Sequence, residues 1–424
     1  MTDPLHHRRR YPALPFRSFL ALACVVACVL LLGACTAPMQ GEPQAEAQAP
    51  QRSFEDYRSQ ALARMRETRH FQHADTESEL AWNGPREWRP ARSGTGAKAE
   101  KGILLVHGLG DSPWSFHDLG AAMAAEGYLV RTVLLPGHGT RPADLLAVSA
   151  RQWRELVQEQ ARALEGDVDG LVYLGGFSTG ANLVLDYAYA HPSIAGLVLF
   201  SPGFKSMPFD WIAPVAARIR PWIVGPGDAM RDQTPVRYLN VPTNGFAQFY
   251  HTSANARRLL SRTYDKPVFM AVAQHDSVLD TGYLLDVFQR RFTHPDSRLI
   301  WYGAAPRQLT DTRRVLVRAD SLPAYRISQF SHMGLLFSPS NALYGEGGSL
   351  RICQNGQAER VTRACLEGEA VWYSDWGYRE PGKVHARLTF NPYFDWQTSI
   401  LIGTFGGNHG VSTDVPSAFS DRRK

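Results

Sequence analysis

Residues 171–190 (LVYLGGFSTGANLVLDYAYA) constrain the fold more than any other stretch of the chain. The stretch opens with an apolar run typical of a buried parallel strand, and apolar residues recur at helical spacing in its second half. Between them, Ser178 stands at the centre of the pattern G-x-S-x-G. Small residues on both sides let the backbone bend sharply and hold the serine hydroxyl at the start of a helix. The stretch predicts strand, sharp turn and helix, with Ser178 as a candidate nucleophile.

Strand and helix signals alternate on both sides of this stretch. Apolar runs typical of buried strands occur at residues 102–106 (GILLV), 128–134 and 267–273 (PVFMAVA), and residues 391–402 have the pattern of a closing helix. The alternation predicts an α/β fold. Two segments, residues 298–303 and 314–318, are candidates for the last strand of the sheet.

The N-terminus has the pattern of an export signal. Four arginines precede an apolar run at residues 19–32, which is short for a membrane-spanning helix. The run ends in LGAC and is similar to the lipobox of bacterial lipoproteins, which implies removal of residues 1–34 and lipidation of Cys35. An ordinary signal peptide with an incidental cysteine is the alternative. A lipidated Cys35 would place the protein at a membrane of the bacterial cell envelope, facing the periplasm.

A tether and a folded domain follow the lipidation site. Thr36 stands where an aspartate would favour retention in the inner membrane, so the outer membrane is the predicted location. Residues 35–52 are rich in Ala, Gln, Pro and Glu, a composition typical of a flexible tether. Residues 53–424 are the predicted folded domain, long enough to bury a large core.

Two cysteines remain after the leader and Cys35 are set aside. Cys353 and Cys365 flank a segment in which Asn355-Gly356 is typical of a hairpin turn, and we predict a disulfide between them. Metal binding is the poorer alternative, because histidines are missing nearby. The pair lies within residues 341–388, which are predicted to form an appended hairpin excursion without an assigned function.

Charge argues against a nucleic-acid partner. The formal net charge of +5 falls to +2 without the four arginines and one aspartate of the leader. The remaining basic residues are scattered, without a basic stripe or interleaved aromatic residues. A nucleic-acid-binding function is therefore not expected.

Four sequence blocks, LLVHGLGDSP, LLPGHGT, LGGFSTG and AVAQHD, resemble the α/β-hydrolase superfamily, in particular its carboxylesterase and monoacylglycerol-lipase-like branch. The resemblance covers residues 102–339. It implies a mostly parallel sheet with helices on both faces and a cap inserted after the sixth strand, which we assign to the aromatic-rich residues 204–265. It also implies a catalytic serine, acid and histidine in that chain order.

The serine needs a base to accept its proton and a carboxylate to orient that base. Asp276 follows the strand at residues 267–273 and is the predicted acid, with Asp280 as its rival. The neighbouring His275 would point away from the site. His332, in a segment similar to the family's terminal S-H motif, is the predicted base, although three other histidines also follow the acid: His294, His385 and His409.

The backbone N–H groups of Leu109 and Thr179 are the predicted oxyanion donors, because the glycine-rich loop and the residue after the nucleophile supply them in this fold. His107 and His138 are predicted to support their loops by hydrogen bonds. No metal or organic cofactor is needed for this chemistry.

The predicted function is an envelope-anchored serine hydrolase that cleaves carboxylic esters through an acyl-enzyme on Ser178, in the manner of a carboxylesterase or lipase. The apolar cap predicts a preference for hydrophobic or lipid esters. An acyltransferase or a thioesterase would use the same residues. A lipid-tethered binding protein that kept the fold without catalysis is the alternative from another class. The oligomeric state is left open.

Overall fold

The computed structural model describes residues 53–90, 98–206, 208–227 and 233–406. The predicted signal peptide, Cys35, the tether and His409 lie outside these described residues. Within them, none of the helices combines the length and the apolar character that crossing a bilayer would require.

The centre of the fold is one sheet. In the described part of the chain, eight strands pair in the order β1-β3-β2-β4-β5-β8-β9-β10. All neighbouring strands are parallel except β1 and β3 at one edge. The strands are β1 Glu87–Trp88, β2 Ala99–Val106, β3 Tyr128–Val133, β4 Val168–Phe177, β5 Ile194–Phe200, β8 Val268–Ala273, β9 Arg298–Tyr302 and β10 Val315–Arg318.

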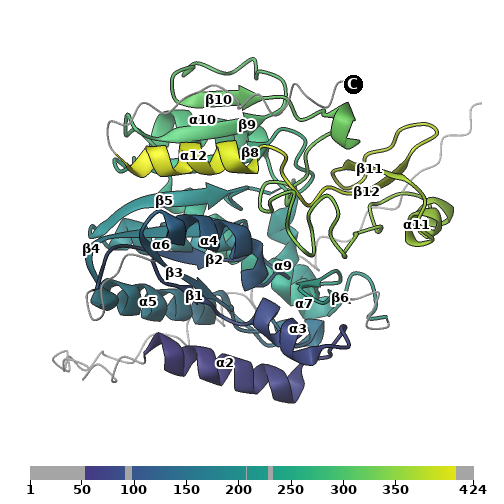
Figure 1. Ribbon diagram of the computed structural model, residues 1–424, viewed down its shortest axis with the longest axis horizontal. Coiled ribbons are helices and arrows are strands. Elements are labelled where there is room, and N and C mark those ends of the chain that lie inside the picture. The colour runs from purple at the N-terminus through teal and green to yellow at the C-terminus, as the bar shows by residue number, and fades with distance from the viewer. Residues whose placement is uncertain (1–52, 91–97, 207, 228–232, 407–424) are drawn as a thin grey trace, which may run out of the picture. The chain divides into compact units, whose positions relative to one another are not determined.

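Helices cover both faces of the sheet, as the apolar strands require. In β2, Leu104 packs into a core shared with α5 and α6, whereas its neighbour Ile103 packs into a second core shared with α4 and α12. Figure 1 shows α4 and α12 on the same face. The helices are α4 His117–Ala125, α5 Ala150–Asp167, α6 Thr179–Ala190, α9 Thr243–Leu259, α10 Thr281–Arg291 and α12 Phe394–Phe405. This is the α/β-hydrolase fold.

The described chain begins with two helices, α2 Phe54–Thr68 and α3 Thr76–Asn83. Between them, Arg69 forms a fully buried ion pair with Glu79 (2.7 Å). The same guanidinium donates hydrogen bonds to the carbonyls of Gly139 and Pro235. This buried cation therefore joins the N-terminal helices to the loop after β3 and to the predicted cap segment.

The segment predicted as the cap, residues 204–265, connects β5 to β8. It follows the fifth strand of the sheet in chain order, not the sixth, because only β1 precedes β2 in the described residues. Besides α9, the segment contains η3 Asp210–Ile212, α7 Ala213–Ile219, β6 Gln233–Thr234 and β7 Arg237–Tyr238.

Both candidate final strands belong to the sheet. β9 pairs with β8, and β10 pairs in parallel with β9 at the edge. β10 is the strand that precedes His332. Short 3₁₀ helices occur in the connecting loops, at η1 Pro113–Phe116, η2 Pro142–Leu146 and η4 Pro323–Tyr325.

Residues 341–388, which we call the appendage, do not form the predicted hairpin. β11 (Val371–Ser374) and β12 (Val384–Arg387) pair in parallel, and α11 (Glu359–Leu366) precedes them. The Asn355 side chain is buried and donates to Ser374 Oγ (3.1 Å) and to the Asp375 carbonyl (3.1 Å). Asn355 therefore holds the strand-bearing half of the appendage instead of turning a hairpin.

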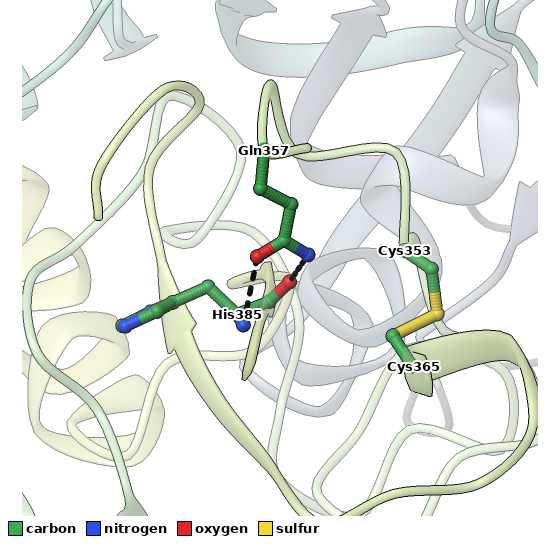
Figure 2. The surroundings of a disulfide bond; sticks show 4 residues. All are labelled: Cys353, Gln357, Cys365 and His385. Atoms are coloured by element: carbon green, nitrogen blue, oxygen red, sulfur yellow. Dashed lines mark hydrogen bonds between the residues drawn. A yellow bond between two sulfur atoms is a disulfide. The ribbon is translucent and has the colours of Figure 1, made fainter. Parts of the chain in front are cut away.

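The predicted disulfide between Cys353 and Cys365 is present in the appendage. It joins the segment before Asn355 to α11, and both cysteines are buried (Figure 2). Beside it, the Gln357 side chain accepts a hydrogen bond from the His385 backbone N–H (3.1 Å) and donates one to the His385 carbonyl. The segment around Gln357, just before α11, is thus hydrogen-bonded to β12. Figure 1 shows α11, β11 and β12 at the same side of the sheet as α7 and β6.

Candidate active site

Ser178 occupies the sharp turn between β4 and α6. Its backbone has φ 53° and ψ −114°, a left-handed conformation that non-glycine residues rarely adopt. The turn requires glycines on both sides of Ser178, because neighbouring backbone atoms leave no space for a Cβ atom there. A Cβ atom at Gly180 would lie 1.9 Å from the carbonyl oxygen of Val106, and one at Gly176 would lie 2.4 Å from the amide of Ala181. Strain of this kind is characteristic of functional sites.

Backbone hydrogen bonds hold Ser178 in place. Its N–H donates to the carbonyl of Phe200 (3.0 Å), and its own carbonyl accepts from Gly203 (3.0 Å) and Ala181 (3.1 Å). The serine is largely buried, but it lines a cavity of about 810 Å³ together with His332. The predicted nucleophile and base therefore meet at one cavity.

Asp276 and His332 form a buried pair. Asp276 Oδ2 lies 2.6 Å from His332 Nδ1, and its other oxygen accepts hydrogen bonds from the backbone N–H groups of Val278 (2.9 Å) and Leu279 (3.2 Å). Because Nδ1 is engaged by the carboxylate, Nε2 is the imidazole nitrogen left for a reacting hydroxyl. The structure thus brings the predicted acid and base into contact, and His332 lines the same cavity as Ser178.

The rival acid has another role. Asp280 precedes α10, and its side chain accepts a hydrogen bond from the Tyr283 backbone N–H (2.9 Å). It also forms an ion pair with Lys205 (2.8 Å), and the pKa of Asp280 is lowered by these hydrogen bonds against an opposing effect of burial. Asp280 is therefore a helix cap.

The other histidines near the acid in sequence have different surroundings. His275 Nδ1 lies 2.6 Å from Asp320, whose hydrogen bond raises the pKa of His275. His294 lies in the turn before β9, and His385 belongs to β12 in the appendage. None of these three lines the cavity.

The predicted oxyanion donors also face the cavity. Leu109 and Thr179 are both among its lining residues. Thr179 is the first residue of α6, so its N–H is one of the helix-terminal donors without an intrahelical acceptor. The two residues belong to adjacent strand ends, because β2 and β4 are paired.

His107 and His138 support the loop that carries Leu109. His107 Nε2 accepts from the Leu135 N–H (3.1 Å), and His138 Nε2 accepts from the Gly110 N–H (2.9 Å). Burial lowers the pKa of His107 to about 4 and the pKa of His138 to about 3. Both rings are neutral at pH 7 and act as fixed hydrogen-bonding groups.

Asp375, from the appendage, joins the two loops of the site. Its carboxylate accepts hydrogen bonds from the backbone N–H groups of Ser277 (2.5 Å) and His332 (3.4 Å). Asp375 is buried, and burial raises the pKa of its carboxyl group. On the other side, Ser201 Oγ donates to the His332 carbonyl (3.0 Å). Sequence reasoning missed both residues, because neither stands in a motif.

The cavity has walls of two kinds. The cap segment contributes mainly apolar side chains, among them Phe209, Ile212, Ala216, Phe246 and Phe249. The appendage contributes Ile352, Gln354, Trp376 and Arg387, a participation that the sequence did not indicate. Within the residues that the structure describes, no three His, Cys, Asp or Glu side chains are grouped as a metal site would require.

One family model matches the chain over residues 97–305, and this family is described as serine aminopeptidase, S33 (Hydrolase_4). The matched region contains Ser178 and Asp276 and ends before His332 and the appendage. The family match and the sheet topology show that the chain is an enzyme, a serine hydrolase with the α/β-hydrolase fold.

Individual relatives match about half of the chain. A thermostable monoacylglycerol lipase from Bacillus sp. (strain H-257) is 28% identical over 200 residues, 44% of this chain and 75% of the relative. A carboxylesterase from Bacillus subtilis (strain 168) is 23% identical over 226 residues, 52% of this chain and 90% of the relative. A solved monoglyceride lipase variant from Saccharomyces cerevisiae is 18% identical, covers 52% of this chain and 82% of its own, and has a TM-score of 0.41.

Proposed function

We propose that this serine hydrolase cleaves carboxylic esters, preferably with apolar acyl groups, through an acyl-enzyme on Ser178. The observation that carries the proposal is the 2.6 Å contact of Asp276 with His332 beside the strained turn of Ser178, at one cavity. The relatives named as a lipase and a carboxylesterase favour esters over peptides.

In the proposed first step, Ser178 Oγ attacks the ester carbonyl carbon while His332 Nε2 takes the hydroxyl proton. The N–H groups of Leu109 and Thr179 stabilise the negative charge on the carbonyl oxygen. The C–O bond to the alcohol then breaks, and the alcohol leaves with the proton from His332. Asp276 keeps the imidazole in the productive tautomer and stabilises its positive charge.

In the second step, water attacks the acyl-enzyme. His332 takes a proton from the water and returns it to Ser178 Oγ, which releases the carboxylic acid and restores the enzyme. An acyltransferase or thioesterase would share the first intermediate and differ in the acceptor or the leaving group. The apolar cap side chains in the cavity favour a hydrophobic acyl group in either case.

The experiment that tests this proposal combines fluorophosphonate labelling with hydrolysis of p-nitrophenyl esters of several acyl lengths. We expect wild type to be labelled and active, and Ser178→Ala to lose both, with kcat lower by a factor of about 10⁴ or more. His332→Ala should behave like Ser178→Ala, whereas Ser193→Ala, an exposed serine, is the matched control. A wild type that is neither labelled nor active would favour the non-catalytic binding protein.

Envelope anchoring is a further part of the proposal. The lipobox-like sequence before Cys35 supports it, and the predicted location is the outer membrane, facing the periplasm. Expression in a bacterial host with an alkyne-labelled fatty acid should label wild type and should not label Cys35→Ser. Cys28→Ser is the matched control, because Cys28 lies within the predicted leader. Equal labelling of wild type and Cys35→Ser would contradict lipidation at Cys35.

A further inference from the structure

Two arginines line the cavity that holds Ser178 and His332. Arg237 belongs to β7 in the cap segment, and Arg387 is the last residue of β12 in the appendage. The rest of the cap wall is mainly apolar, and a simple apolar ester would offer nothing to a guanidinium group. Positive charge at this cavity therefore needs an explanation beyond the proposed ester hydrolysis.

The Arg387 side chain is half-buried and has few partners. Its Nε donates to Asn355 Oδ1 (2.8 Å). Within the described part of the chain this is the one hydrogen bond of the guanidinium, and no carboxylate forms a salt bridge with it there. The terminal nitrogens thus remain for a ligand in the cavity. A half-buried cation at a cavity wall, without a bound counter-charge, favours an anionic ligand.

Among the described residues, the charges around Arg387 act on it without a salt bridge and leave its terminal nitrogens without a bound carboxylate. Burial and the positive charge of Arg237 lower the pKa of Arg387 to about 10, although Asp375 and Asp276 act in the opposite direction. Those two carboxylates are already occupied: Asp375 accepts from the backbone of Ser277 and His332, and Asp276 binds the His332 ring.

The other charged groups of the cavity do not change this balance. Arg237 pairs with Asp111 (2.9 Å), which neutralises part of its charge but leaves its side chain at the cavity wall. Among the described residues that line the cavity, Asp210 is the only Asp or Glu. It lies 3.6 Å from Arg257 and accepts a hydrogen bond from Ser206 Oγ (3.0 Å).

We propose that Arg387, assisted by Arg237, binds a carboxylate or phosphate group of the substrate, so that the enzyme prefers esters with a second, anionic group. The inference rests on the proposed ester hydrolysis at Ser178. A guanidinium presents a planar set of donors that matches the oxygens of either anion. The apolar cap side chains and the two arginines would then bind different ends of one amphiphilic ester.

The test uses substrate pairs that differ only in the anionic group. One pair is p-nitrophenyl hydrogen adipate and p-nitrophenyl methyl adipate, which places a carboxylate on the acyl side. The other pair is octanoylglycerol phosphate and octanoylglycerol, which places a phosphate on the alcohol side. We expect wild type to favour the anionic member of at least one pair by about tenfold in kcat/KM, and the pair that responds identifies the anion.

Variants then assign the preference to Arg387. In Arg387→Gln the anionic-to-neutral ratio should fall about tenfold, while Arg387→Lys should keep part of it because it keeps the charge. Arg379→Gln removes an exposed arginine of the appendage and should keep the wild-type ratio. The ratio cancels any loss of active enzyme that affects both substrates equally.

The outcomes separate this inference from the proposed function. Wild type that cleaves the neutral esters but shows no preference in either pair overturns the anion site and leaves ester hydrolysis intact. An unchanged ratio in Arg387→Gln also overturns the assignment. Wild type without activity on any ester and without fluorophosphonate labelling overturns the proposed function itself. If Arg387→Gln does not fold, the wild-type ratio and its partial decrease in Arg387→Lys decide the question, and an unchanged ratio in Arg387→Lys then overturns the assignment.

Discussion

The cap segment and the appendage both border the cavity, but they differ in the side chains that they expose and bury. The cap segment has large apolar side chains in solvent: Trp211 in η3 is 59% exposed, and Ile219 at the end of α7 is 78% exposed. The appendage has a disulfide and buried polar groups, Asn355 and Asp375, that are hydrogen-bonded to the backbone around them.

This difference separates two tasks. Apolar contact is roughly proportional to area and has little directionality, so the cap is suited to hold acyl chains of various shapes. Hydrogen bonds and ion pairs fix distances and directions, so the appendage is suited to position the loops of Asp276 and His332. We therefore expect substitutions of apolar cap side chains to change binding of the acyl group, and substitutions of the buried polar groups Asn355 and Asp375 to change stability and turnover.

The largest expected effect is a loss of unfolding free energy at acidic pH, caused by His138, on which the cap residue Tyr238 stacks. Tyr238, in the cap segment, stacks on the His138 ring (6.0 Å between centroids), and His138 Nε2 must stay unprotonated to accept from Gly110. Because the folded-state pKa of His138 is about 3, below its ordinary 6.5, the unfolded chain binds the extra proton first as pH falls. The unfolding free energy should fall by about 1.4 kcal/mol per pH unit below pH 6.5 from this residue.

Urea unfolding at a series of pH values measures this effect. In His138→Gln the dependence on pH between pH 6.5 and about 4 should be weaker by that amount, whereas the exposed cap histidine variant His251→Gln should match wild type. Equal slopes in wild type and His138→Gln would show that His138 is not the group that titrates.

The second effect sharpens the comparison from the side of the appendage. Cys353→Ser with Cys365→Ser opens a loop with a sequence separation of 12 residues, and the unfolding free energy should fall by about 3 kcal/mol. Thermal unfolding of wild type with and without reductant provides an independent measurement. If reduction changes neither stability nor turnover, the appendage does not depend on the disulfide for its geometry.

The third effect concerns turnover. The two carboxylate oxygens of Asp375 accept from the backbone N–H groups of Ser277 and His332, and Asp375→Asn replaces one of these oxygens by an NH₂ group. We expect kcat to fall by about tenfold with little change in KM, because the loops that carry the reacting groups are then less well positioned. Glu380→Gln, an appendage carboxylate paired with Lys383, is the matched control. A pH–rate profile for Asp375→Asn should also change, because the environment of the His332 backbone is altered. If Asp375→Asn lowers the free energy of unfolding but changes neither kcat nor the pH–rate profile, Asp375 stabilises the fold without positioning the site.

The smallest expected effect lies in the cap. Ile212 lines the cavity, so Ile212→Ser should raise KM for long-chain esters by about threefold and leave short-chain esters nearly unchanged. Ile219→Ser, on the solvent side of the same short helix region, should leave both unchanged. A larger effect on kcat than on KM in Ile212→Ser would mean that the cap also positions the reacting groups, against the division of tasks proposed here.

Much of the fold and of the candidate site could be predicted from local sequence patterns. The strand, turn and helix around Ser178 follow from apolar spacing and from glycines at positions that no other residue could occupy. Asp276 was predicted from chain order and the strand before it, and His332 from chain order and its likeness to the family's S-H motif. The appendage was predicted less well, because its parallel strands and the buried side chain of Asn355 depend on partners distant in sequence.

The sequence by itself determined the alternation of strands and helices, the turn at Ser178 and the pairing of Cys353 with Cys365, because each depends on residues close together in the chain. Only the tertiary structure decided that Asp375 reaches the backbone beside Asp276 and His332, and that Arg237 and Arg387 meet at one cavity. Contacts between segments far apart in the chain leave no local pattern, and they arise when the apolar elements pack.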